Sequence, residues 1–103
     1  MARNKIVSDE FSRDMGYSEN EFFHTLPTAI RDYEFVREGT RVTITHPQRD
    51  HQLELQVVPL PDRKIALMRI PRVEVNFSFK NFSTAERDQF MAFFEQSFQR
   101  GGG

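Results

Sequence analysis

The chain has 103 residues, a net charge of −1, 38% hydrophobic and 28% charged residues, and no cysteine. This length and composition fit one folded domain, and the absence of cysteine excludes disulfides, thiolate nucleophiles and zinc–thiolate sites. The near-neutral charge, the lack of any apolar run near the roughly 20 residues of a membrane span and the lack of a signal peptide predict a cytoplasmic protein with no nucleic-acid or membrane partner.

The chain begins with a polar segment followed by a helix signal. Residues 1–16 show no clear periodicity, and we expect them to form an N-terminal arm. Ser18 and Glu21 then have the S-x-x-E spacing of a capping box, in which a hydroxyl and a carboxylate satisfy the free amides of a helix start. Apolar residues follow at helical spacing. The sequence therefore predicts a helix over residues 18–32 that kinks or restarts at Pro27.

Strand patterns occupy most of residues 33–82. Residues 33–37, 41–45 and 52–57 alternate between apolar and polar side chains, and residues 59–62 contain the prolines that we expect to end the third strand. Six apolar residues lie at odd-numbered positions of one segment: Ile65, Leu67, Val73, Val75, Phe77 and Phe79. We therefore predict one long strand over 65–82, bent at Pro71; a two-residue hairpin at Pro71-Arg72 is the alternative.

A second capping box, Ser83 to Glu86, precedes an aromatic stripe that predicts a helix over residues 83–100. Gly101–Gly103 then form a flexible tail. The predicted order is α-β-β-β-β-α, an α+β two-layer sandwich in which an antiparallel four-stranded meander carries both helices on one face. We expect a single domain over residues 17–100.

Residues with catalytic or metal-binding chemistry are few. His46, Asp50 and His51 offer a two-histidine, one-carboxylate set, but the loop between them has the composition of a solvated turn, so they are weak metal candidates. No nucleophile elbow or phosphate-binding loop is present, so we expect no enzyme activity and no cofactor. Phe77 and Phe79 share parity with strand-core residues, which indicates packing rather than base stacking.

Residues 63–72 depart from the general pattern, with four basic residues, no acidic residue and apolar side chains on both parities. A half-strand of this kind needs a cover on its second face. The cover could be the N-terminal arm through Phe11 and Met15, a second copy of the chain, or a separate partner or ligand. The predicted interface comprises Arg63, Lys64, Ala66, Met68, Arg69, Ile70 and Arg72.

The sequence therefore predicts a non-enzymatic binding or assembly module with a protein partner or a homo-oligomeric state. Residues 8–38 hold eight acidic and three basic residues, a charge that the basic strip could attract within one chain or between two. The first alternative is a small ligand-binding or metal-binding protein or enzyme with a cleft near His46, Asp50 and His51. The second is a carrier protein that uses its glycine tail.

Overall fold

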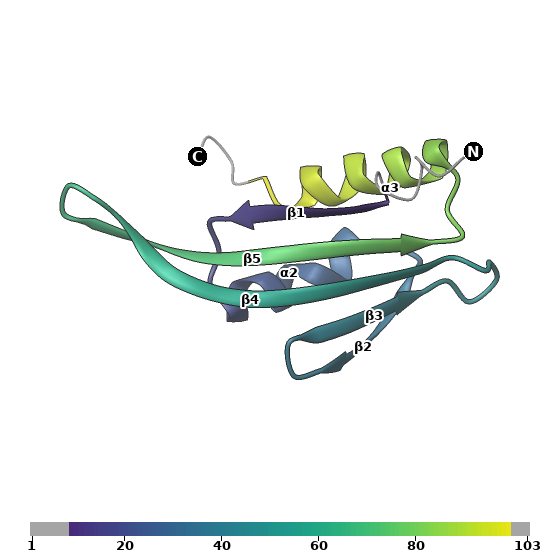
Figure 1. The fold of residues 1–103 in the computed structure, drawn as a ribbon, viewed down its shortest axis with the longest axis horizontal. Coiled ribbons are helices and arrows are strands. Elements are labelled where there is room, and N and C mark those ends of the chain that lie inside the picture. The colour runs from purple at the N-terminus through teal and green to yellow at the C-terminus, as the bar shows by residue number, and fades with distance from the viewer. Residues whose placement is uncertain (1–8, 100–103) are drawn as a thin grey trace.

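The computed structural model describes residues 9–99, which form one five-stranded sheet and two helices (Figure 1). The sheet order β1-β5-β4-β3-β2 is antiparallel throughout. The predicted α+β class is confirmed, with one strand more than the predicted meander and the chain order β-α-β-β-β-β-α. The elements are β1 (Glu10–Met15), α2 (Glu19–Ala29), β2 (Glu34–Glu38), β3 (Arg41–Thr45), β4 (Gln52–Ile65), β5 (Met68–Lys80) and α3 (Thr84–Ser97).

The additional strand, β1, lies within the segment predicted as a polar arm. Phe11 and Met15 pair with Phe77 and Val73 of β5, and both pack against the core. The rings of Phe11 and Phe77 stack with their centroids 4.9 Å apart. An edge strand of this kind needs only a few apolar residues on one side, so its mainly polar sequence gives no clear alternation. Residues 1–8 of the predicted arm lie outside the described residues.

Strands β4 and β5 form one long hairpin, which corrects the sequence prediction. β4 does not end at residues 59–62 but continues to Ile65, and the chain reverses at Ala66-Leu67. The single strand predicted over 65–82 is confirmed from Met68 to Lys80, where β5 continues through Pro71, but residues 65–67 belong to the end of β4 and to the turn. The alternative turn at Pro71-Arg72 is wrong. Ala66 has a φ of 55°, the positive value that two-residue hairpin turns require at their first central position.

Three prolines are tolerated in this hairpin because its far half has no outer neighbours. β3 pairs with β4 only as far as Gln56, and β1 pairs with β5 only up to Val73. Proline lacks the N–H that a central strand donates, and it is therefore confined to edges, strand starts and bulges. The prolines Pro59, Pro61 and Pro71 all lie in the half of the hairpin that projects beyond the neighbouring strands.

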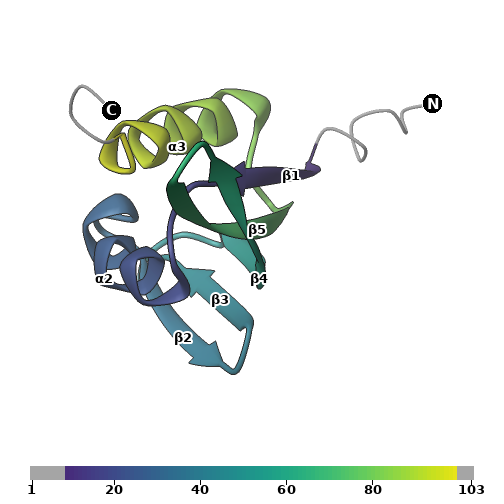
Figure 2. The ribbon, with the colours of Figure 1, turned by 90° about the vertical axis from the view of Figure 1, so that its left-hand side faces the viewer.

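Helices α2 and α3 lie on the same side of the sheet (Figure 2). Both predicted capping boxes form, at Ser18 with Glu21 and at Ser83 with Glu86. Helix α2 runs through Pro27 without a break and ends at Ala29, so the predicted restart is absent. The core between helices and sheet includes Phe22, Leu26, Val42, Ile44, Leu53, Leu55, Val57, Val73, Val75, Phe77, Phe79, Phe90 and Phe94. Burial of Phe77 and Phe79 confirms their packing role.

Candidate functional site

The outer half of the β4–β5 hairpin projects from the body of the protein as a two-stranded ribbon (Figure 1). The predicted interface lies here, but its geometry differs from the prediction. Residues 63–65 end β4, the turn follows, and residues 68–72 begin β5. Residues 63–72 have apolar side chains at both odd and even positions because the chain reverses direction within this segment. The two sets of apolar side chains therefore do not belong to the two faces of one strand.

Within the described part of the N-terminal segment, residues 9–16 do not cover this ribbon. Phe11 and Met15 pack against the core. This segment meets the ribbon at its base, where Asp14 pairs with Arg72 and where a Cβ added at Gly16 would lie 3.6 Å from Cγ2 of Ile70. Ile70 is therefore half-buried. Met68 remains 61% exposed, so residues 9–15 leave it uncovered.

Most large exposed hydrophobic side chains among residues 9–99 gather at the apex of the ribbon. Leu67 is 100% exposed and Ile65 is 50% exposed, with Met68 beside them. The exception is Val36, on β2. Sequence reasoning missed Ile65 and Leu67, because parity assigned them to the buried face. The turn Ala66-Leu67 also lacks the glycine, asparagine or aspartate that usually marks a two-residue hairpin.

Basic residues lie directly behind the apex. Lys64 pairs across the hairpin with Arg69, and Arg63 pairs with Ile70. Arg69 lies 3.9 Å from Asp62, an exposed ion pair that contributes little. We call residues 63–69 the hairpin tip, and Arg63, Lys64 and Arg69 its basic collar.

Arg72 belongs to the base of the ribbon rather than to its tip. Its guanidinium donates to Asp14 of β1 at 2.6 Å. This hydrogen bond lowers the pKa of the Asp14 carboxyl below its ordinary value of 3.8. Arg72 therefore links the edge strand to β5, at a shorter distance than that of the ion pair between Arg69 and Asp62.

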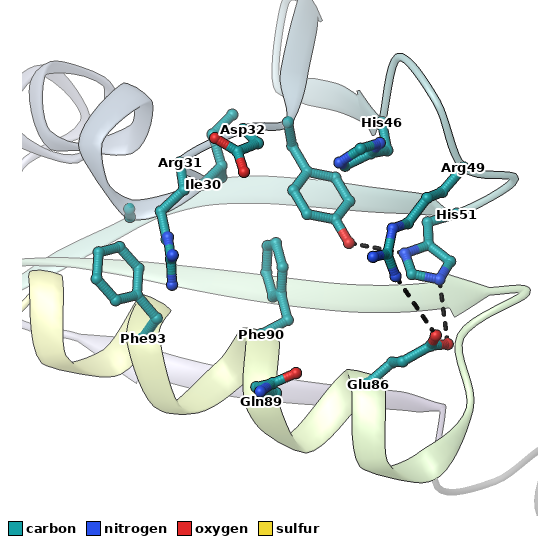
Figure 3. Close-up of a pocket in the computed structure, with 12 residues that line it drawn as sticks. Ile30, Arg31, Asp32, His46, Arg49, His51, Glu86, Gln89, Phe90 and Phe93 are labelled. Atoms are coloured by element: carbon teal, nitrogen blue, oxygen red, sulfur yellow. Dashed lines mark hydrogen bonds and ion pairs between the residues drawn. The ribbon is translucent and has the colours of Figure 1, made fainter.

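A second site is a pocket of about 260 Å³ between the start of α3, the end of α2 and the loop that joins β3 to β4 (Figure 3). The first alternative from the sequence, a cleft near the histidines, corresponds to this pocket. Its lining residues are Ala29, Ile30, Arg31, Asp32, Tyr33, His46, Arg49, His51, Glu86, Gln89, Phe90 and Phe93.

His51 organises one end of the pocket and is only 7% exposed. Its Nε2 lies 3.1 Å from Oε1 of Glu86, and its Nδ1 lies 2.7 Å from the hydroxyl of Tyr33. A carboxylate only accepts, so Nε2 carries the proton and Nδ1 accepts the Tyr33 hydroxyl proton. The same Glu86 oxygen accepts the backbone N–H of Ser83 at 2.9 Å, which ties the chain of hydrogen bonds to the start of α3.

The ionisation of this group favours structure over catalysis. The backbone hydrogen bond from Ser83 lowers the pKa of Glu86, and His51 adds to this effect. Burial raises the pKa of the Tyr33 hydroxyl above its ordinary value of 10.0. At neutral pH Glu86 is therefore ionised and Tyr33 is protonated, so the tyrosine donates a hydrogen bond and is a poor nucleophile.

The weak metal candidates do not form a ligand set. Both ring nitrogens of His51 are engaged, and Nδ1 of His46 lies 3.0 Å from the backbone N of Gln48. Asp50 accepts from Asn81 and does not line the pocket. Within residues 9–99, no three histidine, aspartate or glutamate side chains gather as metal ligands would. His46, Asp50 and His51 therefore have different hydrogen-bond partners and do not act together as one site.

Two further sequence predictions meet the limits of the described chain. Gly101–Gly103, on which the carrier alternative depends, lie outside the described residues. Between residues 9 and 99, neither helix has the length and apolar character needed to cross a membrane.

Comparisons of the chain with protein-family models, with curated proteins and with solved structures found no match. The functional assignment therefore depends on the geometry of the hairpin tip and the pocket.

Proposed function

We propose that the protein is a non-enzymatic docking module that attaches through its hairpin tip to an anionic partner surface. The observation that carries this proposal is the apex itself: Ile65, Leu67 and Met68 are exposed side by side, with the basic collar directly behind them. Burial of such side chains on a partner supplies affinity, and the collar supplies orientation and a fast encounter with negative charge.

A second copy of the chain fits the tip less well than an anionic partner. Symmetric contact between two tips would bring two basic collars together, and like charges at close range oppose association. A stable protein interface also buries roughly 1,200–2,000 Å², more than the few side chains of one apex provide. Self-association therefore needs surface beyond the tip.

The test is a photo-crosslinking amino acid placed at Leu67 in the intact cell, with Gln48 as the matched control. Gln48 is exposed in the loop between β3 and β4, at the opposite end of the molecule (Figure 1). We expect adducts, with protein or with lipid, at position 67 and not at 48, and we expect their loss when Lys64 and Arg69 are changed to Glu. Equal yields at positions 67 and 48 would refute docking through the tip.

The pocket supports a second candidate function, the binding of a small planar anion. Arg31 and Arg49 lie at opposite ends of the pocket with Phe90 between them (Figure 3). Arg31 has a φ of 52°, a conformation that costs energy in a non-glycine residue, and its guanidinium lies 4.5 Å from the centroid of the Phe93 ring.

Benzoate is a suitable probe for this second candidate. Titration followed by NMR should shift the side-chain signals of Arg31, Arg49 and His46, with Arg41 on β3 as a control outside the pocket. Shifts of the same size at Arg41, or none at all, would remove the pocket as a ligand site.

A further inference from the structure

We propose that the anionic partner of the hairpin tip is a lipid bilayer, into whose surface the apex inserts. This inference depends on the docking function proposed for the same tip. Three features of the tip favour a bilayer over an acidic protein: the order of its side chains along the hairpin, their distribution over both of its faces, and its projection from the body.

The side chains of the tip follow the order of the layers of a bilayer surface. Leu67 lies at the turn, the pair Ile65 and Met68 comes next, and the pair Lys64 and Arg69 lies one residue farther back. One residue of a strand spans about 3.3 Å. Apolar surface that binds at a membrane interface is buried about 5–10 Å deep, at the boundary of headgroups and acyl chains. Lysine and arginine just behind it extend their charged ends to the phosphates.

The basic collar surrounds the hairpin rather than marking one face. Lys64 and Arg69 are cross-strand partners and share a face, whereas Arg63 lies on the opposite face with Ile65 and Met68. A groove on an acidic protein contacts one face and leaves the other in water. A bilayer encloses an inserted hairpin on all sides, and its phosphates therefore meet the basic residues of both faces.

The shape of the molecule allows the tip to reach a flat surface. The principal-axis extents are 49, 30 and 29 Å, and the hairpin projects along the longest axis (Figure 1). Pro59, Pro61 and Pro71 remove N–H donors from its unpaired edges, which disfavours docking by strand addition and leaves contact to side chains. The sequence predicts no membrane partner because the net charge of −1 gives no general attraction to an anionic membrane. The attraction that we propose here departs from that prediction, since it is local to the collar.

The experiment uses the absence of tryptophan from the chain. A Leu67→Trp variant carries its only tryptophan at the apex, and Gln48→Trp is its matched control. The probes are vesicles of phosphatidylcholine alone and vesicles in which about a third of the lipid is phosphatidylglycerol, an anionic lipid of the kind that attracts basic segments. We expect a blue shift of emission for Leu67→Trp with the anionic vesicles, a smaller shift with neutral vesicles and none for Gln48→Trp.

Co-sedimentation with the same vesicles separates the contributions of charge and apolar contact. Lys64→Gln and Arg69→Gln should each weaken binding about fivefold, whereas Lys80→Gln, at the far end of β5, should leave it unchanged. Leu67→Asp should weaken binding at least tenfold. All these positions are exposed, and equal thermal melts would show that the variants fold alike.

Several outcomes would overturn the lipid proposal: no vesicle binding by the wild type, equal binding to neutral and anionic vesicles, or equal losses for Lys64→Gln and Lys80→Gln. If vesicles fail to bind while position 67 still forms collar-dependent protein adducts in the cell, the partner is an acidic protein, and the docking function stands without the bilayer. If position 67 also forms no adducts above those of position 48, the docking function fails as well.

Discussion

The hydrogen bond between Tyr33 and His51 can be measured by a double-mutant cycle of Tyr33→Phe and His51→Phe. Tyr33→Phe leaves Nδ1 of a buried imidazole without a donor, and an unsatisfied buried polar group costs about 1–3 kcal/mol. His51→Phe leaves the Tyr33 hydroxyl without its acceptor. Because Tyr33 is half-exposed and water reaches it, the cost of this second change belongs at the lower end of that range. In His51→Phe, the phenyl ring retains the stacking position that the imidazole holds 4.1 Å from the centroid of Phe82.

The double variant should be more stable than the sum of the single changes predicts. Once position 51 is phenylalanine, removing the Tyr33 hydroxyl breaks no hydrogen bond to it, so we expect a coupling free energy of about 1 kcal/mol. Urea denaturation followed by circular dichroism gives the four free energies of unfolding. In thermal melts each kcal/mol corresponds to about 4–8 °C for a domain of up to about 100 residues.

Tyr17→Phe provides the control for this cycle. The Tyr17 hydroxyl donates to the backbone oxygen of Phe98, at the end of α3 remote from Glu86. Its cost should add to that of His51→Phe within about 0.3–0.5 kcal/mol. If Tyr33→Phe and His51→Phe are also additive within that margin, the hydrogen bond contributes nothing measurable, and the argument that it orders the pocket fails.

Three further predictions concern the hairpin turn, the pH dependence of stability and the exposure of the apex. Ala66→Gly should raise the free energy of unfolding by about 0.5–1 kcal/mol, because glycine adopts the positive φ of the turn without strain; an unchanged or lower value in urea denaturation would contradict this. Folding lowers the pKa values of Asp14 and Glu86, so the unfolded chain takes up protons first, and the free energy of unfolding should fall as the pH drops through their ordinary values of 3.8 and 4.5. Asp14→Asn should make this dependence of stability on pH less steep, and an unchanged slope would count against the pair with Arg72. Leu26→Ala, in the core, should cost about 2–5 kcal/mol, whereas Leu67→Ala should change stability by less than about 0.5 kcal/mol; a large loss for Leu67→Ala would show that the apex packs against the protein itself.

The elements that the sequence predicted correctly are those with strong local signals. Ser18 and Ser83 each lie three residues before a glutamate, and both capping boxes form with both hydrogen bonds. The alternation over 52–57 places Leu53, Leu55 and Val57 in the core. In these segments the local preference and the tertiary packing agree, which is why pattern alone was sufficient.

The elements that the sequence missed depend on neighbours that are remote in the chain. β1 is a strand because Phe11 and Met15 meet β5, more than fifty residues later. The ribbon continues through Pro59 and Pro61 because no third strand pairs with β4 there, a fact that the order of the sheet decides. The odd-position pattern of apolar residues places Leu67 on the buried face, and this prediction is wrong. A turn with neither glycine nor asparagine has no local marker in the sequence.

The sequence predicts only part of the pocket, because several of its residues are remote from one another in the chain. His46 and His51 were named as candidates, and both line it. Tyr33 and Glu86, which form hydrogen bonds with His51, come from 18 residues before it and 35 residues after it. No local motif links these positions, and one of the two, Glu86, was already assigned a complete role as a helix cap. A residue that serves two roles at once is easily overlooked when its first role explains it.

The residues that stabilise the fold lie in the body of the protein and not in the ribbon. Every core residue of the sheet lies at or before Val57 or at or after Val73, so within the described chain the hairpin between them buries no core side chain. Ala66 adds backbone strain and Leu67 exposes apolar surface; neither feature stabilises the fold. Folding therefore gives no reason for an apolar apex behind which basic residues gather, whereas contact with another surface does. Leu67 variants should therefore report on docking with little effect on stability, because this side chain is fully exposed.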